Sequence, residues 1–138
     1  MTGKEFLKQI RDINITIISL QMEIERLNAM LTSTTIKPKD VNVQTSTPAD
    51  PMADKIIKKV EYEDKLKACI CRQMTIKGKA LTLIDSMERQ GDKSVLMLRY
   101  INCLSIKDIM DQMDASRATV NNRLRDAEKN FNALYSQS

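Results

Sequence analysis

Apolar residues recur at alternating intervals of three and four along the first 31 residues of the chain. This spacing is a heptad seam, and it predicts a coiled-coil helix over residues 1–31. β-Branched residues at a with Leu at d favour a parallel dimer, although an Ile at the first d position leaves a trimer open. The a and d positions of the seam are Ile10, Ile13, Ile17, Leu20, Ile24, Leu27 and Leu31.

One narrow seam cannot be buried by the helix that carries it. The sequence leaves three partners open: a second copy of the chain, the second helical segment of the same chain, or a different protein. Because the seam lasts fewer than four heptads, it is also compatible with one face of an ordinary helix bundle. Homo-oligomerisation through the N-terminal helix is the resulting prediction.

Helical periodicity stops between residues 32 and 53, where all three prolines lie among many Ser and Thr residues. This composition predicts a flexible linker, with a short strand at Val41 to Val43 as a weak alternative. Periodicity returns over residues 54–90 and predicts a long helical region. Gly78 is either tolerated inside a continuous helix or marks a kink, and Gly91 is expected to end the region.

Residues 91–138 divide into helical segments at their capping signals. Asp92 is expected to cap a first helix, and Ser105 with Asp108 forms a capping-box-like start for a short second helix. Ser116, another strong N-cap, starts the final helix after a three-residue turn. Two short helices joined by such a turn, the second with an apolar stripe, predict a helix-turn-helix. The stripe consists of Val120, Leu124, Ala127 and Phe131.

The final helix begins with side chains suited to DNA. In a helix-turn-helix the second helix enters the major groove, and its amino-terminal amides and dipole favour a phosphate. Arg can bond guanine bidentately, and Asn can bond adenine in the same way. Arg123 is expected either to bind phosphate or to pack near the stripe. The predicted DNA-binding residues are Ser116, Arg117, Ala118, Thr119, Asn121, Asn122, Arg123 and Arg125.

Composition agrees with an all-α fold and narrows the functional classes. Aromatic residues make up 4% of the chain and Gly and Pro number three each, which argues against the many tight turns of an all-β chain. The chain contains no His, so the familiar His-based catalytic and metal sites cannot be built from it alone. We therefore expect no catalytic site, no cofactor and no metal site.

Charge and hydropathy predict a cytoplasmic protein that binds a partner. The net charge of +4 permits nucleic-acid binding without demonstrating it. Three Cys without a C-x-x-C spacing are typical of reduced thiols in the cytosol. No apolar run is long enough to cross a membrane, so no membrane association is expected.

A family resemblance covers roughly residues 81–131. The segment resembles region 4 of sigma-70-class sigma factors, and more closely the small sigma-region-4-like regulators of phages and prophages of Gram-positive bacteria. Their pattern is R-Y-x-x-G-L-S-x-x-E-I-A followed by S-x-x-T-V-x-x-R-L-x-x-A. The matching positions are Arg99, Tyr100, Leu104, Ser105, Ile109, Ser116, Thr119, Val120, Arg123, Leu124 and Ala127.

The chain departs from that pattern at four positions. Cys103 and Asp114 occupy two usual Gly positions, Asp108 replaces Glu, and Met110 replaces a small Ala. Asp tolerates the left-handed backbone conformation better than most residues, so Asp114 can still form the turn. The resemblance implies recognition of a promoter element and, in full sigma factors, docking on RNA polymerase.

Two function classes follow. The first is a sequence-specific DNA-binding transcriptional regulator of phage or prophage type that is not an enzyme, with double-stranded DNA and RNA polymerase as expected partners. Deletion of residues 1–31 is then expected to weaken DNA binding by removing bivalency. The second is a protein-interaction or assembly module, either an RNA polymerase-binding adaptor or the small subunit of a phage DNA-packaging machine.

Overall fold

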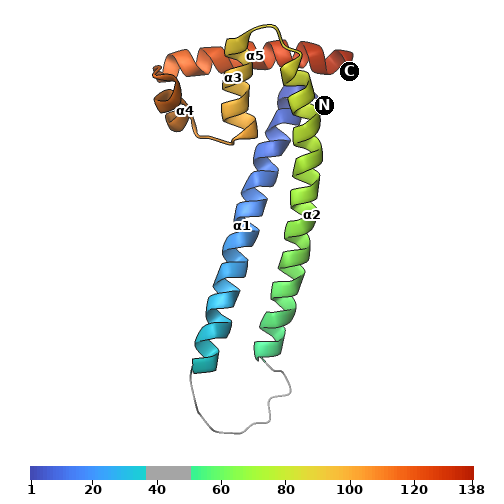
Figure 1. Cartoon of the computed structure of the whole chain (residues 1–138), viewed down its shortest axis with the longest axis vertical. Coiled ribbons are helices and arrows are strands. Elements are labelled where there is room, and N and C mark those ends of the chain that lie inside the picture. The colour runs from blue at the N-terminus through green and yellow to red at the C-terminus, as the bar shows by residue number, and fades with distance from the viewer. Residues whose placement is uncertain (37–50) are drawn as a thin grey trace. The chain divides into compact units, whose positions relative to one another are not determined.

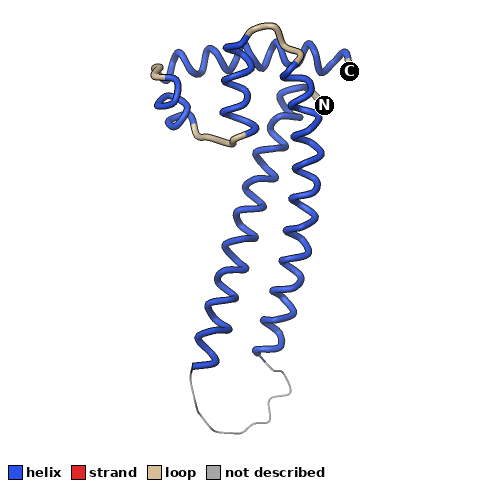
Figure 2. The backbone as a smooth tube through the Cα atoms, viewed as in Figure 1, coloured by secondary structure: helices blue, strands red, loops and turns tan. Residues whose placement is uncertain are grey.

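The computed structural model describes residues 1–36 and 51–138, apart from the side chains of residues 33–36, and every regular element in this part of the chain is helical (Figure 1). Short loops join the helices that follow residue 51 (Figure 2). The predicted all-α class is confirmed. None of the described helices combines the length and apolar character that a membrane span requires. The elements are α1 (Gly3–Ile36), α2 (Pro51–Asp85), α3 (Gln90–Leu96), the π-helix η1 (Met97–Ile101), α4 (Ile106–Met113) and α5 (Arg117–Gln137).

The first two helices are longer than the sequence pattern predicts. α1 continues past residue 31 to Ile36, and α2 begins at Pro51 instead of residue 54. Pro suits the first turn of a helix, because the N–H that it lacks would have no intrahelical partner there. α2 is continuous through Gly78, so this residue does not break the helix. The rest of the predicted linker, with the alternative strand at Val41 to Val43, lies outside the described residues.

The structure corrects two predictions at the start of α3. α2 ends at Asp85, so Gly91 lies inside α3 instead of ending the long helix. The residue before α3 is Arg89, whose side chain makes no capping hydrogen bond. Asp92 does not cap the helix, because its carboxylate is buried and accepts a 2.7 Å hydrogen bond from Asn130 Nδ2.

The described residues form two compact units, and α1 and α2 each contribute to both. We call residues 1–15 and 72–138 the head, and the described part of residues 16–71 the stem. This grouping differs from the predicted division at residue 31, because the first turns of α1 pack with the C-terminal helices.

The head has one continuous apolar core to which all of its elements contribute. At its edge, the ring of Phe6 stacks on Tyr135 with centroids 5.1 Å apart. Gly3 approaches α5 so closely that an added Cβ would stand 2.7 Å from the Asn132 Cα. The start of α1 is therefore an integral helix of the head. The fully buried side chains include Leu7, Ile10, Ile84, Val95, Leu96, Ile109, Val120 and Phe131.

The stem is an antiparallel pair of helix segments, one from α1 and one from α2 (Figure 1). The seam residues Ile17 and Leu27 are buried in it. Leu20, Ile24 and Leu31 are half-buried. The seam is thus covered within one chain, which corresponds to the intramolecular alternative left open by the sequence.

The two remaining seam residues, Ile10 and Ile13, lie in the head and are buried there. None of the seven seam residues is therefore exposed. The seam itself is not a free surface for a second copy of the chain.

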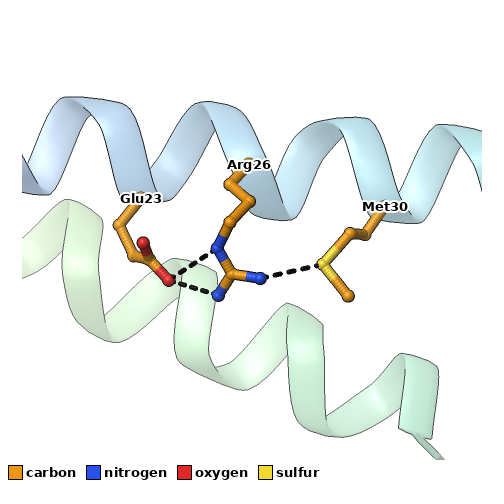
Figure 3. A network of polar contacts seen from close by, with 3 residues as sticks. All are labelled: Glu23, Arg26 and Met30. Atoms are coloured by element: carbon orange, nitrogen blue, oxygen red, sulfur yellow. Dashed lines mark hydrogen bonds and ion pairs between the residues drawn. The ribbon is translucent and has the colours of Figure 1, made fainter.

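A polar network joins three side chains of α1 in the stem (Figure 3). Arg26 Nε donates a 2.9 Å hydrogen bond to Glu23 Oε1, and its Nη2 also contacts this oxygen. Arg26 Nη1 contacts the Met30 sulfur at 3.2 Å. The hydrogen bond from Arg26 lowers the pKa of the Glu23 carboxyl, and the same bond raises the pKa of Arg26. Residues three and four apart on a helix are surface neighbours, which explains this geometry.

The stem also exposes several large apolar side chains. Their exposed fractions range from 37% to 63%, although the seam beside them is covered. They occur on both helices of the stem, and they are Ile18, Met22, Ile56, Ile57, Val60 and Ile70.

Candidate nucleic-acid interface

The helix-turn-helix consists of α4, the turn at residues 114–116 and α5. Ser105 Oγ accepts a 3.2 Å hydrogen bond from the Asp108 backbone N–H, so the predicted cap of α4 is confirmed. Asp114 ends α4 in the left-handed conformation with φ 50° and ψ 52°, as its tolerance for that region allows. The Ala115 N–H then donates to the Met110 carbonyl at 3.1 Å, which closes the turn.

Ser116 caps α5 as predicted. Its Oγ accepts a 3.2 Å hydrogen bond from the Thr119 N–H and lies 2.9 Å from Thr119 Oγ1. Thr119 is half-buried. The two hydroxyl groups bond each other at the helix start, so their first role is to fix where α5 begins.

The apolar stripe of α5 holds the helix on the head. Val120, Leu124, Ala127 and Phe131 are all buried, in agreement with the predicted spacing. Ile109 of α4 is fully buried in the same core cluster. Burial of this stripe fixes which side of α5 faces away from the core.

The other predicted DNA-binding residues of α5 point away from the core. Arg123 is also exposed, so it does not pack against the apolar stripe. The side chains are close to the helix start and free of the core, as a groove-facing set requires. The exposed residues of the predicted set are Ser116, Arg117, Ala118, Asn121, Asn122, Arg123 and Arg125.

A row of four exposed side chains lies opposite the stripe. Ala118, Asn122, Arg125 and Lys129 follow one another at intervals of four, three and four residues, which keeps them on one helix face. Arg125 Nη1 approaches Asn122 Oδ1 at 3.5 Å, the outer limit of a hydrogen bond. The sequence prediction omitted Lys129, although the same helical spacing could have added it.

Electrostatics on α5 favour an anionic partner more than the count of its charges suggests. Glu128 is half-buried and accepts a short hydrogen bond from the Tyr100 hydroxyl. It also lies 3.9 Å from the Lys4 ammonium. Burial and the hydrogen bond to Glu128 raise the pKa of Tyr100, so the phenol stays protonated and keeps donating. One of the two acids near the exposed row is thereby paired, and Asp126 is left as the exposed one.

The turn before α4 is held by side chains from distant parts of the chain. Arg11 Nη1 donates to the carbonyls of Arg99 at 2.8 Å and Leu104 at 3.1 Å. Arg99 Nη1 donates to the same Leu104 oxygen at 3.0 Å. Cys103 stands in the left-handed region with φ 57°, and its thiol lies 3.3 Å from the Tyr100 carbonyl. Cys103 thus performs the turn that a Gly makes in the sigma-like pattern, with the strain that a side chain adds there.

Burial also shifts the ionisation of this turn. Desolvation lowers the pKa of Arg99, and the charge of Arg11 lowers it further. Desolvation raises the pKa of the Cys103 thiol, while the positive charges of Lys77, Arg11 and Arg99 act in the opposite direction. Three cations therefore act on one small turn of the head.

The head has a cleft lined by charged side chains. The described residues contain no group of three or more His, Cys, Asp or Glu side chains that could hold a metal ion. The cleft, of about 540 Å³ beside the middle of α5, mixes acids and bases, among them Glu88, Arg89, Asp126 and Lys129. The set lacks a Ser, Cys or Lys nucleophile held by a hydrogen-bonded base, which nucleophilic catalysis requires.

Comparison with known proteins places the chain in a family. A family profile described as "Protein of unknown function (DUF1492)" matches residues 30–132, which include α2, α4 and most of α5. No curated protein and no solved structure matches the chain. Since the match covers about three quarters of the sequence, the chain belongs to the DUF1492 family.

Proposed function

We propose that this protein is a sequence-specific DNA-binding transcriptional regulator of the sigma region 4-like type that reads the major groove with α5. One observation carries the proposal: a Ser-capped helix-turn-helix in which the apolar stripe of the second helix is buried and its polar face is free. In such units the second helix enters the groove with its amino-terminal residues at the base edges.

The side chains on the free face have the chemistry of base recognition. Asn122 and Arg125 stand at the centre of the exposed row, with Arg117 and Asn121 beside it. Arg pairs bidentately with guanine and Asn with adenine, and each good pair discriminates by about 1–3 kcal/mol. The backbone N–H groups at the start of α5 add a site for a phosphate.

The proposal includes a biological setting. The protein acts in the cytoplasm on phage or prophage promoters, with double-stranded DNA as its main partner and RNA polymerase as a further one. It forms a homo-oligomer through the N-terminal helix. The exposed Ile18 and Met22 support an interface on a face of this helix other than the heptad seam. It is not an enzyme and uses no cofactor. The sigma-like pattern, with its left-handed turns at Cys103 and Asp114, supports this reading.

Selection of binding sites from random DNA by the full-length protein tests the proposal. Asn122→Ala is expected to relax the selected sequence at one position and to weaken binding to the preferred site about tenfold, within the range for loss of one base contact. Asn28→Ala is the matched control, because Asn28 is an exposed Asn in the stem. Absence of salt-sensitive DNA binding by the intact protein would sink the proposal.

A second candidate is the protein-interaction or assembly module. The exposed apolar side chains of the stem favour it, because both stem helices offer large apolar side chains to a partner. In this version the protein is an RNA polymerase adaptor or a DNA-packaging small subunit. Co-purification with polymerase without DNA affinity selects the adaptor, whereas binding confined to viral packaging sequences selects the packaging subunit.

A further inference from the structure

Two arginine side chains from two elements of the head meet at the turn before α4, and the charge of a lysine from a third element acts on the same turn. Arg11 comes from α1, Lys77 from α2 and Arg99 from η1. Arg11 and Arg99 donate to one oxygen, the Leu104 carbonyl, at 3.1 Å and 3.0 Å. Their Nη1 atoms therefore lie close to each other, because both are within hydrogen-bonding distance of the same oxygen.

These cations lack a neutralising partner nearby. Within residues 1–36 and 51–138, none of the three forms an ion pair with a carboxylate. Glu128, an acid whose charge acts on Arg99, already accepts a hydrogen bond from Tyr100 and pairs with Lys4. Two guanidinium groups held this close repel each other, so a stable arrangement of this kind favours an anion beside it.

The cluster also has hydrogen-bond donors that are not used in the described contacts. Arg11 and Arg99 use only their Nη1 atoms in the described contacts, although a guanidinium has five N–H donors. Lys77 makes no hydrogen bond or ion pair among the described residues, yet its charge reaches Cys103. All three side chains are half-buried, so a part of each remains accessible. A structural role in holding the turn explains the Nη1 hydrogen bonds of Arg11 and Arg99. It does not explain why the charge of Lys77 also acts on this turn.

Backbone geometry prepares the turn for this role. The π-helix η1 contains Arg99, and π-helical turns occur frequently at functional sites. The left-handed Cys103 stands two residues after the end of η1 and turns the chain into Leu104. Ser105, the N-cap of α4, is the next residue, so the cationic cluster adjoins the start of that helix.

We infer that Arg11, Lys77 and Arg99 bind a phosphate of the DNA backbone beside the start of α4. The inference rests on the proposed function, and it adds a contact made partly by the N-terminal helix. The first helix of a helix-turn-helix crosses the DNA backbone, which brings its start to a phosphate while the second helix lies in the groove. Arg and Lys are the usual phosphate ligands, and contacts of this kind position the protein without reading sequence.

The salt dependence of DNA binding tests the inference with Lys77→Gln, since Lys77 holds no hydrogen bond whose loss would disturb the fold. The variant is expected to bind DNA several-fold more weakly, and the loss is expected to be the same for preferred and random DNA. The slope of log K against log salt is expected to fall by about 1, the value for one lost phosphate contact. Lys67→Gln is the control, because it removes the same charge from an exposed position on the same helix.

Arg11→Lys and Arg99→Lys extend the test, with thermal unfolding measured to confirm that each variant folds. Both variants keep the positive charge but lose the forked donor geometry of the guanidinium group. Each is therefore expected to weaken binding to all DNA sequences alike and to leave the selected sequence unchanged. A salt slope that is the same for Lys77→Gln and the unmodified protein would overturn the inference and leave the proposed function standing. If the unmodified protein binds no DNA, the proposed function and the DNA role of this cluster fail together.

A titration with inorganic phosphate tests whether the cluster binds free phosphate instead of a phosphate of the DNA backbone. NMR titration of the full chain with phosphate is expected to give weak shifts at the cluster that DNA suppresses. Saturable phosphate binding that persists when DNA is bound would overturn the assignment to the DNA backbone.

Discussion

The head and the stem use one heptad seam in two different ways. In the head, Ile10 joins a core built from every element, and side chains from five helices there have no exposed surface. In the stem, only Ile17 and Leu27 of the seam are buried, and large apolar residues stand in solvent on both helices. A regular sequence pattern therefore does not fix how well its residues are buried; the number of helices that surround each residue does.

The largest expected effect compares the two regions directly. Phe131→Ala should lower the free energy of unfolding by about 3–5 kcal/mol, because it empties a fully buried site surrounded by several elements. Leu27→Ala in the stem should cost about 2 kcal/mol, at the low end for such a truncation, since fewer elements surround it. Urea unfolding followed by circular dichroism measures both, and Ala133→Ser is the exposed control in α5. Equal losses at the two sites would break the contrast between head and stem.

An intermediate effect tests whether α1 belongs to the head. Gly3→Ala should destabilise the protein by about 1–3 kcal/mol, because its Cβ would stand 2.7 Å from the Asn132 Cα and 3.0 Å from the Phe131 ring. Gly78→Ala is the matched control. Its Cβ meets nothing within 4 Å, so it should stabilise α2 by about 0.5–1 kcal/mol through helix propensity. Thermal unfolding of both variants decides the matter, and a neutral Gly3→Ala would place the start of α1 outside the head core.

The smallest expected effect lies on the exposed side of the stem. Arg26→Gln should raise the pKa of Glu23 towards its ordinary value of 4.5, because the hydrogen bond that lowers it is lost. A lowered pKa in the folded state means that any stabilisation is present above the unfolded pKa and disappears as the pH falls through the folded one. The two proteins should thus differ in stability above pH 4.5 and converge in stronger acid. NMR titration of the Glu23 carboxyl measures the shift, and an unchanged pKa would show that the Arg26 contact does not form in solution.

Local signals predicted the parts of the head that depend on neighbours in sequence. Ser105 and Ser116 cap their helices and the α5 stripe is buried, because caps and helical spacing act over three or four residues. The same kind of local signal predicts that Asp92 is a cap, which is wrong. Its true partner is Asn130, 38 residues away, which no local pattern indicates.

Long-range contacts were the part that the sequence could not reveal. Arg11 reaches the Leu104 carbonyl across 93 residues, and its place between seam residues gave no reason to expect a role beside the helix-turn-helix. The seam raised a related difficulty. Three kinds of partner satisfy the same heptads, so only the fold shows that α2 and the head cover them. Deletion of residues 1–31 would therefore remove core residues such as Leu7 and Ile10, and a loss of DNA binding would report unfolding rather than lost bivalency.

The hydrogen bond from the Gly3 N–H to Asn132 Oδ1, 2.6 Å long, joins residues 129 positions apart. During synthesis, α1 emerges before α5 and has no complete head to pack on until α5 has been made. Closing so long a loop costs entropy before any core contact repays it, which slows folding. The core of the head is thus complete only after α5 has been made, and until then the apolar start of α1 depends on α2 or a chaperone for cover.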